Sequence, residues 1–377
     1  MTTIGFDAKR IVCNGTGLGS YGRTLVNSLA RLAGDSRELR LYAPDAGSDD
    51  LRRQVDASPH VTMVYPKGKW LRLQRDLWRT HGVVDDLKAD GVQVYHGLSG
   101  ELPVGIRKAG IRSVVTIHDL IFLRHPEYYH WWDVAIYKYK FRKALEEADR
   151  VIAISECTKR DILHYGHIDE DRIQVIYQSC GTRFAVPATD EKKAAVRRRY
   201  LLPGRYILNV GTIERRKNVG LAVRALRQLP DDVHLVIVGK QTGYAKDVFN
   251  DASTDHLIDR IHMLSGVPDD DLPAIYQQAE CFVYPSRYEG FGIPVIEAIQ
   301  SGLPVVACTG SCLEEAGGPH SLYVAPDDVE GMAEAVRQVL DGSKGRDERI
   351  RQSREYIRRF ENADVAQQVA DLYASLL

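Results

Sequence analysis

Residues 284–302 read YPSRYEGFGIPVIEAIQSG and join the end of a strand, a glycine-rich loop and the start of a helix. The apolar run CFVY at 281–284 predicts a buried strand, and Pro294 is expected to open a helix. Proline suits the first helical position because the N–H that it lacks would be unpaired there. Gly292 and Ile293 carry no side-chain oxygen that could cap this helix, so its first amides are predicted to bind an anion such as phosphate.

Two glutamates flank this predicted anion site. Glu289 lies in the loop before the helix, and Glu297 is expected in the first turn of the helix. Carboxylates are unfavourable beside a phosphate alone, but each can accept two or more hydrogen bonds from hydroxyl groups. The pair therefore favours a ligand that carries phosphate and hydroxyls together. The alternative is structural: a solvated loop side chain, and a first-turn glutamate that the helix dipole stabilises by less than about 1 kcal/mol.

Length and composition indicate a soluble two-domain protein. The 377 residues are too many for one ordinary core, and 50 basic against 51 acidic residues argue against a nucleic-acid partner held by bulk charge. No apolar stretch approaches the roughly 20 residues of a membrane span, and the N-terminus lacks the layout of a signal peptide. The six cysteines form no CxxC pair. We therefore expect a reduced, cytoplasmic protein without a structural metal.

Short apolar runs alternate with helical patterns along the whole chain, which predicts parallel sheets covered by helices. Residues 184–205 contain two prolines and a charged helix and are interpreted as the linker between two series of strands. The expected strands of the first series are 3–6, 39–42, 61–65, 92–95, 113–117, 151–154 and 173–176, and those of the second are 206–210, 235–238, 261–264, 281–284, 305–307 and 322–324. Two Rossmann-like domains with a site in the cleft between them fit this count.

A second charged segment, GTIERRKN at 211–218, follows the first strand of the second series. Arg216 and Lys217 stand beside a predicted helix that Asn218 is expected to cap. Arginine offers bidentate geometry and lysine a point charge, so the pair indicates another anion site. The alternative is a solvated run of charge.

These two segments carry a family resemblance. Glu289 and Glu297 around GFGIPVIEA, followed by GLPVV at 302–306, together with the RRKN loop, resemble the signature of the retaining glycosyltransferases of family 4, also called glycosyl transferases group 1. The resemblance implies the GT-B fold: an acceptor-binding domain at 1–184, a domain at 185–359 that binds a nucleoside diphosphate sugar, and a last helix at about 360–377 that crosses back to the first domain.

The resemblance also implies roles for individual residues of the second domain. It makes Glu289 a contact of the donor sugar and Glu297 a contact of the ribose, and it makes Arg216 and Lys217 the cations that neutralise the diphosphate. The other residues that it implies for donor binding are Gly211, Gly239, Val267, Gly290, Phe291, Gly292 and Ile293.

His118 and Asp119 follow the expected strand at 113–117, within VVTIHDLIFLRHPEY. A lone histidine is often structural, but this segment resembles the one in which the family's histidine reaches the donor sugar and the scissile bond. The implied catalytic residues are therefore His118, Arg216, Lys217 and Glu289. Asp119 is interpreted as a residue that orients the imidazole or caps a turn.

Three glycines, Gly17, Gly19 and Gly22, match the GxGxxG pattern of dinucleotide-binding proteins. That pattern requires its first glycine directly at a strand end, and here ten residues intervene. We expect instead a long flexible loop that opens a helix at 21–32. The resemblance places such a loop near the donor phosphate, which Gly17 and Gly19 would contact, and near the acceptor; a turn without a ligand is the alternative. The acceptor-binding candidates are Gly19, Tyr21, His96, Glu101 and Asp119.

Two aromatic segments, 65–81 and 128–139, raise the question of membrane contact. The first interleaves tryptophans with five lysines and arginines, as a basic amphipathic helix on a membrane surface does. For both segments we favour the simpler interpretation, in which the tryptophans pack on the protein's own sheet.

The resemblance as a whole implies a retaining transfer of a sugar from a GDP- or UDP-sugar to an acceptor hydroxyl. It requires no cofactor and no metal, and TIHDLIFLRHPEYY at 116–129 resembles mannosyltransferases that use GDP-mannose. A saccharide or lipid-linked saccharide acceptor in bacterial surface polysaccharide or glycolipid assembly is expected, in the cytoplasm or at the inner face of the membrane, with no nucleic acid. The alternatives are a GT-B nucleotide-sugar epimerase or hydrolase and a dinucleotide-dependent oxidoreductase.

Overall fold

The computed structural model describes residues 2–67, 72–178, 180–254, 256–361 and 364–377, and it separates into two compact units. The first comprises Met1–Gln178 together with Asp364–Leu377, and the second comprises Ser179–Ala363. The sequence predicts boundaries at 184 and about 360, a few residues away.

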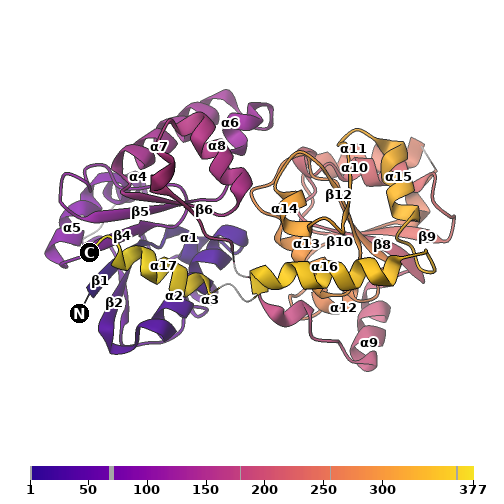
Figure 1. Ribbon diagram of the computed structural model, residues 1–377, viewed down its shortest axis with the longest axis horizontal. Coiled ribbons are helices and arrows are strands. Elements are labelled where there is room, and N and C mark those ends of the chain that lie inside the picture. Colours follow the sequence, from indigo (N-terminus) through magenta and orange to yellow (C-terminus); the bar gives the residue numbers. More distant parts are fainter. Residues whose placement is uncertain (1, 68–71, 179, 255, 362–363) are drawn as a thin grey trace. The chain divides into compact units, whose positions relative to one another are not determined.

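The first unit is built on a sheet of seven parallel strands in the order β3-β2-β1-β4-β5-β6-β7. Figure 1 labels β1, β2, β4, β5 and β6 of this sheet. The strands are β1 Thr2–Asp7, β2 Arg37–Tyr42, β3 Val61–Val64, β4 Val94–Gly97, β5 Arg112–Ile117, β6 Arg150–Ala153 and β7 Ile173–Val175. The helices are α1 Lys9–Cys13, α2 Gly17–Ala33, α3 Asp49–Arg52, α4 Arg72–Leu77, α5 Val83–Ala89, α6 Ile121–Arg124, α7 Trp131–Glu147, α8 Glu156–Gly166 and α17 Val365–Ala374. A π-helical turn, Trp78–Gly82, follows α4.

The second unit has a sheet of six parallel strands in the order β10-β9-β8-β11-β12-β13. The strands are β8 Arg205–Val210, β9 Val233–Val238, β10 Ile261–Leu264, β11 Cys281–Tyr284, β12 Val305–Cys308 and β13 Leu322–Val324. The helices are α9 Asp190–Tyr200, α10 Val219–Leu226, α11 Tyr244–Thr254, α12 Leu272–Tyr276, α13 Ile293–Gln300, α14 Leu313–Gly317, α15 Val329–Arg337 and α16 Arg346–Glu361.

Every strand that the sequence predicts is present, with its ends within two residues of the expected positions. The reason is that central strands of a covered parallel sheet are buried on both faces and read as continuous apolar runs. All four residues of β11 are buried, for example, and so are all four of β12. The last helix, α17, packs on α2 within the first unit, as expected.

The flexible glycine loop expected after β1 is wrong, because α1 and α2 occupy this segment and Gly17, Gly19 and Gly22 lie inside α2. The Asn14 side chain accepts hydrogen bonds from the backbone of Thr16 and of Gly19, at 2.8 and 3.4 Å. A Cβ at Gly19 would lie 1.8 Å from the carbonyl oxygen of Asn14. Glycine is therefore needed here for close packing of the chain.

Each sheet reverses its strand order at one point, where α/β proteins bind ligands at the carboxyl ends of the strands. In the second unit this point lies between β8 and β11, whose loops carry Lys217 and Glu289. In the first unit it lies between β1 and β4, and the next strand, β5, leads into His118. The predicted residues of each unit thus gather at its switch point.

Candidate functional site

The loops after β8 and β11 meet in a cluster of opposite charges. Lys217 Nζ donates to Glu289 Oε1 at 2.5 Å and to the Tyr284 hydroxyl at 2.7 Å. Arg216 Nη1 lies 2.9 Å from Glu289 Oε2, and the Ser286 hydroxyl donates to Glu289 at 2.6 Å. The sequence predicts that both cations and Glu289 face a ligand. The structure adds that each cation also binds Glu289. Tyr284 and Ser286, which sequence reasoning missed, stand inside the same stretch of chain.

Burial and charge act in opposite directions on Glu289. Burial by itself would raise the pKa of this carboxyl, but Lys217 and Arg216 outweigh it and lower the pKa to about 2. The same attraction raises the pKa of both cations despite their desolvation. All three groups are therefore charged at neutral pH, inside a site from which water is largely excluded.

Helix α13 begins beside this cluster with no side chain capping its N-terminus, as the sequence predicts. Gly292 holds the N-cap position at φ 118°, a conformation that favours glycine. The ring of Phe291 is buried and packs edge-on against Phe360, so its side chain anchors the loop to the core. The contact of Phe291 with the donor stays a prediction. Glu297 lies in the second helical turn rather than the first, because the helix already begins at Ile293.

Next to the cluster, the carboxyl ends of β8, β9 and β10 surround an open cavity of about 470 Å³. The predicted donor residues Gly211, Gly239 and Val267 line it together, with Lys240 and Ser265. A Cβ at Gly239 would lie 1.9 Å from the Gly211 carbonyl oxygen, and one at Gly211 would lie 3.9 Å from Lys217 Cε. The cavity therefore adjoins the charged cluster, as a nucleotide attached to a diphosphate would require.

Asn218 occupies the N-cap position of α10, but its side chain does not cap the helix as predicted. The side-chain amide instead donates to the carbonyl oxygens of Pro285, at 3.1 Å, and Pro326, at 2.8 Å. Asn218 thus ties the cationic loop to the loop that follows β11.

Glu297 combines burial with weak stabilisation of its charge. Burial raises the pKa of this carboxyl to about 7, although Arg183 and the hydroxyl of Tyr276, which donates at 3.2 Å, act to lower it. A carboxylate must be ionised to accept from two ribose hydroxyls with both of its oxygens. A ribose at Glu297 would therefore bind better as the pH rises.

For an intact GDP- or UDP-sugar, whose diphosphate does not titrate near pH 7 and whose ribose binds Glu297 as the sequence predicts, we expect the affinity to fall about tenfold for each pH unit below pH 7, as one required deprotonation dictates. Glu297→Gln should weaken binding and abolish this pH dependence. Tyr276→Phe removes a group that lowers the pKa, so it should move the midpoint to higher pH. Isothermal calorimetry across pH tests all three, and an unchanged pH profile in Glu297→Gln would contradict the ribose contact.

The first unit has its own cavity, of about 240 Å³, at the end of β5. It brings together the predicted residues Glu101, His118 and Asp119, and it adds Tyr129, the last residue of the segment 116–129, and Lys140. Carboxylates beside aromatic rings can bind the hydroxyls and the apolar face of a sugar. The cavity is therefore the candidate saccharide site of this unit.

Hydrogen bonds hold the imidazole of His118 in one orientation. Its Nε2–H donates to the carbonyl oxygen of Leu98 at 2.9 Å, and its Nδ1 accepts from the Gln178 side chain at 2.9 Å. The ring of Tyr21 packs edge-on against it, with 4.8 Å between centroids. Burial lowers the pKa of His118 to about 4, so the ring is neutral at physiological pH.

His96 does not lie on an acceptor loop as predicted. Strand β4 extends two residues beyond the expected end, and His96 within it is fully buried. Its Nδ1 lies 2.6 Å from the Tyr373 hydroxyl and its Nε2 lies 2.8 Å from Thr116 Oγ1, which in turn lies 3.3 Å from the Tyr21 hydroxyl. His96 therefore connects α17 to the packing around His118.

In the segment 65–81, the structure supports the favoured interpretation, in which a tryptophan packs inside the protein, over the alternative of a basic surface helix. Arg79 is buried and ion-paired with Asp7 at 2.5 Å and with Glu101 at 2.7 Å. Trp78 is also buried, and its indole N–H donates to Asp86 at 2.7 Å. Residues 68–71 of this segment lie outside the described residues.

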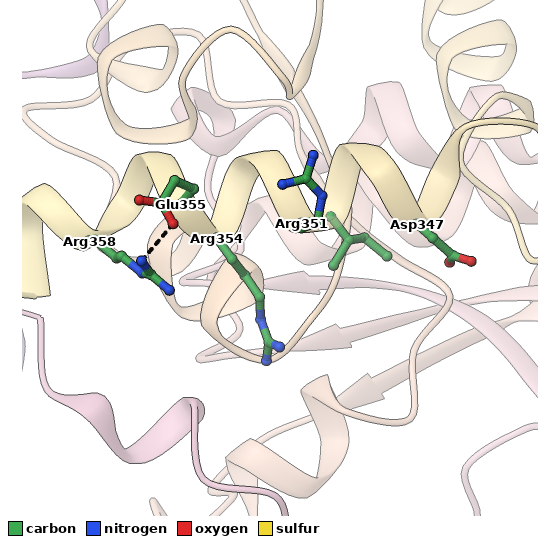
Figure 2. A pocket seen from close by; sticks show the side chains of 6 residues that line it. Asp347, Arg351, Arg354, Glu355 and Arg358 are labelled. Carbon is green, nitrogen blue, oxygen red and sulfur yellow. Dashed lines mark ion pairs between the residues drawn. The ribbon is translucent and has the colours of Figure 1, made fainter.

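A further hollow lies on α16 and is lined by Asp347, Ile350, Arg351, Arg354, Glu355 and Arg358 (Figure 2). Arg358 pairs with Glu355 at 2.7 Å, and Arg354 donates to the Gln300 carbonyl oxygen at 2.9 Å. The first contact is a pair within α16 that stabilises the helix, and the second ties α16 to the end of α13.

Among the described residues, no three His, Cys, Asp or Glu side chains are grouped so as to hold a metal ion. Within the same residues, no helix has the length and hydropathy that crossing a bilayer requires.

Family profiles match both halves of the chain. The family profile Glycosyltransferase Family 4 matches residues 15–180, and Glycosyl transferases group 1 matches residues 193–356. O-antigen chain mannosyltransferase B of Escherichia coli is 28% identical over 356 residues, which cover 88% of this chain and 89% of the relative.

Solved structures resemble the whole chain. Sucrose-phosphate synthase from Thermosynechococcus elongatus has a TM-score of 0.77 at 21% identity, with coverage of 100% of this chain and 99% of the other. HepE of Anabaena, solved with UDP and glucose, has a TM-score of 0.75 at 18% identity, with coverage of 100% of both chains. These similarities confirm the predicted pair of Rossmann-like domains of the GT-B type.

Proposed function

Because the chain belongs to the group 1, family 4 glycosyltransferases and is a hexosyltransferase, we propose that it transfers mannose from GDP-mannose to a saccharide acceptor. The mannosyltransferase identity of the relative from Escherichia coli supports the choice of sugar. The proposal includes retention of the anomeric configuration, an acceptor in surface polysaccharide or glycolipid assembly, and a location in the cytoplasm at the inner face of the membrane.

The charged cluster of the second unit supports a role in departure of the leaving group. When the glycosidic bond breaks, negative charge develops on the β-phosphate of the nucleoside diphosphate. Arg216, Lys217 and the first amides of α13 would stabilise this charge, and such preorganised donors contribute a few kcal/mol each. Glu289 would accept hydrogen bonds from the sugar hydroxyls while keeping the two cations in place.

No protein nucleophile is part of the proposal. The acceptor hydroxyl attacks from the face of the leaving group, and the departing phosphate takes its proton. A retaining hydrolase would instead need two carboxylates about 5 Å apart around the bond. Glu289 and Glu297 are assigned to different parts of the donor, the sugar and the ribose.

The observation that carries the proposal is that Lys217 and Arg216 both pair with Glu289 at one switch point, beside an uncapped helix. A thermal-shift screen of UDP, GDP and their sugars tests it, since a ligand at 100 times its Kd adds about 2.7 kcal/mol to the free energy of unfolding. We expect the largest shift with GDP and GDP-mannose. A larger shift with UDP-sugars would overturn the choice of donor, and product analysis without an acceptor would reveal an epimerase or hydrolase.

We also propose that transfer requires neither a cofactor nor a divalent metal. The charge of Arg216 and Lys217 supports this, because the cations occupy the place where a metal would neutralise the diphosphate. Treatment with EDTA should leave the initial rate of transfer unchanged within error, in a radiolabelled-donor assay. Complete loss of activity that added Mg²⁺ or Mn²⁺ restores would contradict the proposal.

A further inference from the structure

The outward face of α7 carries large apolar side chains that the described chain leaves uncovered. Trp131 is 77% exposed, Trp132 48%, Ile136 49% and Tyr139 53%. These residues lie within the first three turns of the helix and on one side of it, while Phe141 and Leu145 on the other side are buried in the core. The sequence-based interpretation that these tryptophans pack on the sheet is therefore wrong.

The same face carries positive charge. Lys138 is exposed, and the guanidinium of Arg142 lies 6.0 Å from the centroid of the Tyr139 ring. Glu146, at the far end of the helix, is 3.7 Å from Arg142 and offsets part of this charge. Tryptophan and tyrosine combine an apolar ring with a polar N–H or O–H, which suits the boundary between lipid chains and headgroups. Lysine beside such rings is typical of helices that lie on anionic membranes. Tryptophan, tyrosine and arginine are also enriched at protein–protein interfaces, but lysine is depleted there, so Lys138 favours lipid as the partner.

The inner side of α7 forms a wall of the cavity in the first unit. Tyr137, Lys140 and Phe141 line this cavity together with His118 and Asp119. One helix therefore presents aromatic rings to the exterior and borders the candidate saccharide site with its other side.

We propose that the outer face of α7 rests on an anionic lipid bilayer and thereby brings the cavity of the first unit to a lipid-linked saccharide acceptor. The identity of the acceptor rests on the proposed function, whereas the contact with lipid does not. The four exposed apolar residues enter the headgroup region, and Lys138 and Arg142 pair with lipid phosphates.

Co-sedimentation with vesicles tests the contact without any sugar. Wild-type protein should bind vesicles of phosphatidylcholine mixed equally with phosphatidylglycerol more tightly than vesicles of phosphatidylcholine alone. The double variant Trp131→Ser with Trp132→Ser should bind at least tenfold more weakly to both. Lys138→Glu with Arg142→Glu should lose only the preference for the anionic vesicles. Leu201→Ser is the matched control, because Leu201 is 80% exposed in the second unit, and its binding should not change.

Three outcomes would overturn the proposal. In the first, wild-type protein stays in the supernatant with both vesicle types, and in the second, the double variant binds as wild type does. In the third, size-exclusion chromatography shows a tryptophan-dependent dimer and the protein does not bind vesicles. Circular dichroism and an unchanged Tm establish that the variants are folded. The double variant should transfer sugar to a water-soluble oligosaccharide at the wild-type rate. Vesicle binding without transfer of any sugar would contradict the proposed function but would still support the contact with lipid.

Discussion

Replacement of Lys217 by alanine is expected to lower kcat about a thousandfold, the upper range for loss of one preorganised donor of this kind. Lys217 lies at the cluster in which the diphosphate is proposed to bind, with 17% of its side chain exposed. Its charge matters most when the β-phosphate gains negative charge, so kcat should fall more than the affinity for the donor. Single-turnover kinetics and calorimetry with free nucleotide measure the two effects separately.

Neighbouring substitutions separate this effect from a general loss of positive charge. Arg215 precedes the pair, but 75% of its side chain is exposed and it pairs with Asp247 across the surface. Arg215→Ala should therefore retain near-normal turnover, and Lys217→Arg should recover part of the activity that Lys217→Ala loses. Normal turnover in Lys217→Ala, or an equal loss in Arg215→Ala, would refute the role of Lys217 as a donor to the leaving group.

Glu289→Gln should lower the free energy of unfolding by about 3 to 5 kcal/mol, the usual cost of removing one partner from a buried ion pair. The neutral amide would leave the charges of Arg216 and Lys217 without their shared carboxylate. Because the folded-state pKa of Glu289 is about 2, its contribution is complete above about pH 4.5 and is lost as the pH falls toward 2. Urea denaturation followed by far-UV circular dichroism at several pH values measures this loss.

A surface carboxylate provides the control for Glu289. Glu214 also binds Arg216, at 2.7 Å, but 38% of its side chain is exposed. Glu214→Gln should therefore change the free energy of unfolding by less than about 1 kcal/mol. Equal losses in the two variants would show that burial of Glu289 adds nothing to the stability of the cluster.

The sequence is sufficient to predict the two sheets, because burial on both faces leaves apolar runs such as 281–284 that identify strands directly. It also predicts the uncapped start of α13, since the absence of a side-chain oxygen at Gly292 and Ile293 is a local property. Residues whose roles depend on their immediate neighbours can thus be found without a structure.

Contacts between distant parts of the chain could not be predicted. Lys217 and Glu289 are far apart in sequence, and their motifs assign each to a ligand without regard to the other. The prediction for His96 is wrong because a strand end uncertain by two residues decides whether a side chain lies in a loop or in the core. The glycines of α2 mislead for another reason: close packing and phosphate binding both require a missing side chain, and the pattern alone does not distinguish them.

The bond between His96 and Tyr373 has a consequence for biosynthesis. Tyr373 belongs to the final helix, so the first unit is assembled from the beginning and the end of the chain. A ribosome releases the early strands long before their last partner, and the middle of the chain can finish folding first. Until Tyr373 has been translated, His96 lacks one of its two ring partners, and the nascent N-terminal part cannot reach its complete native packing.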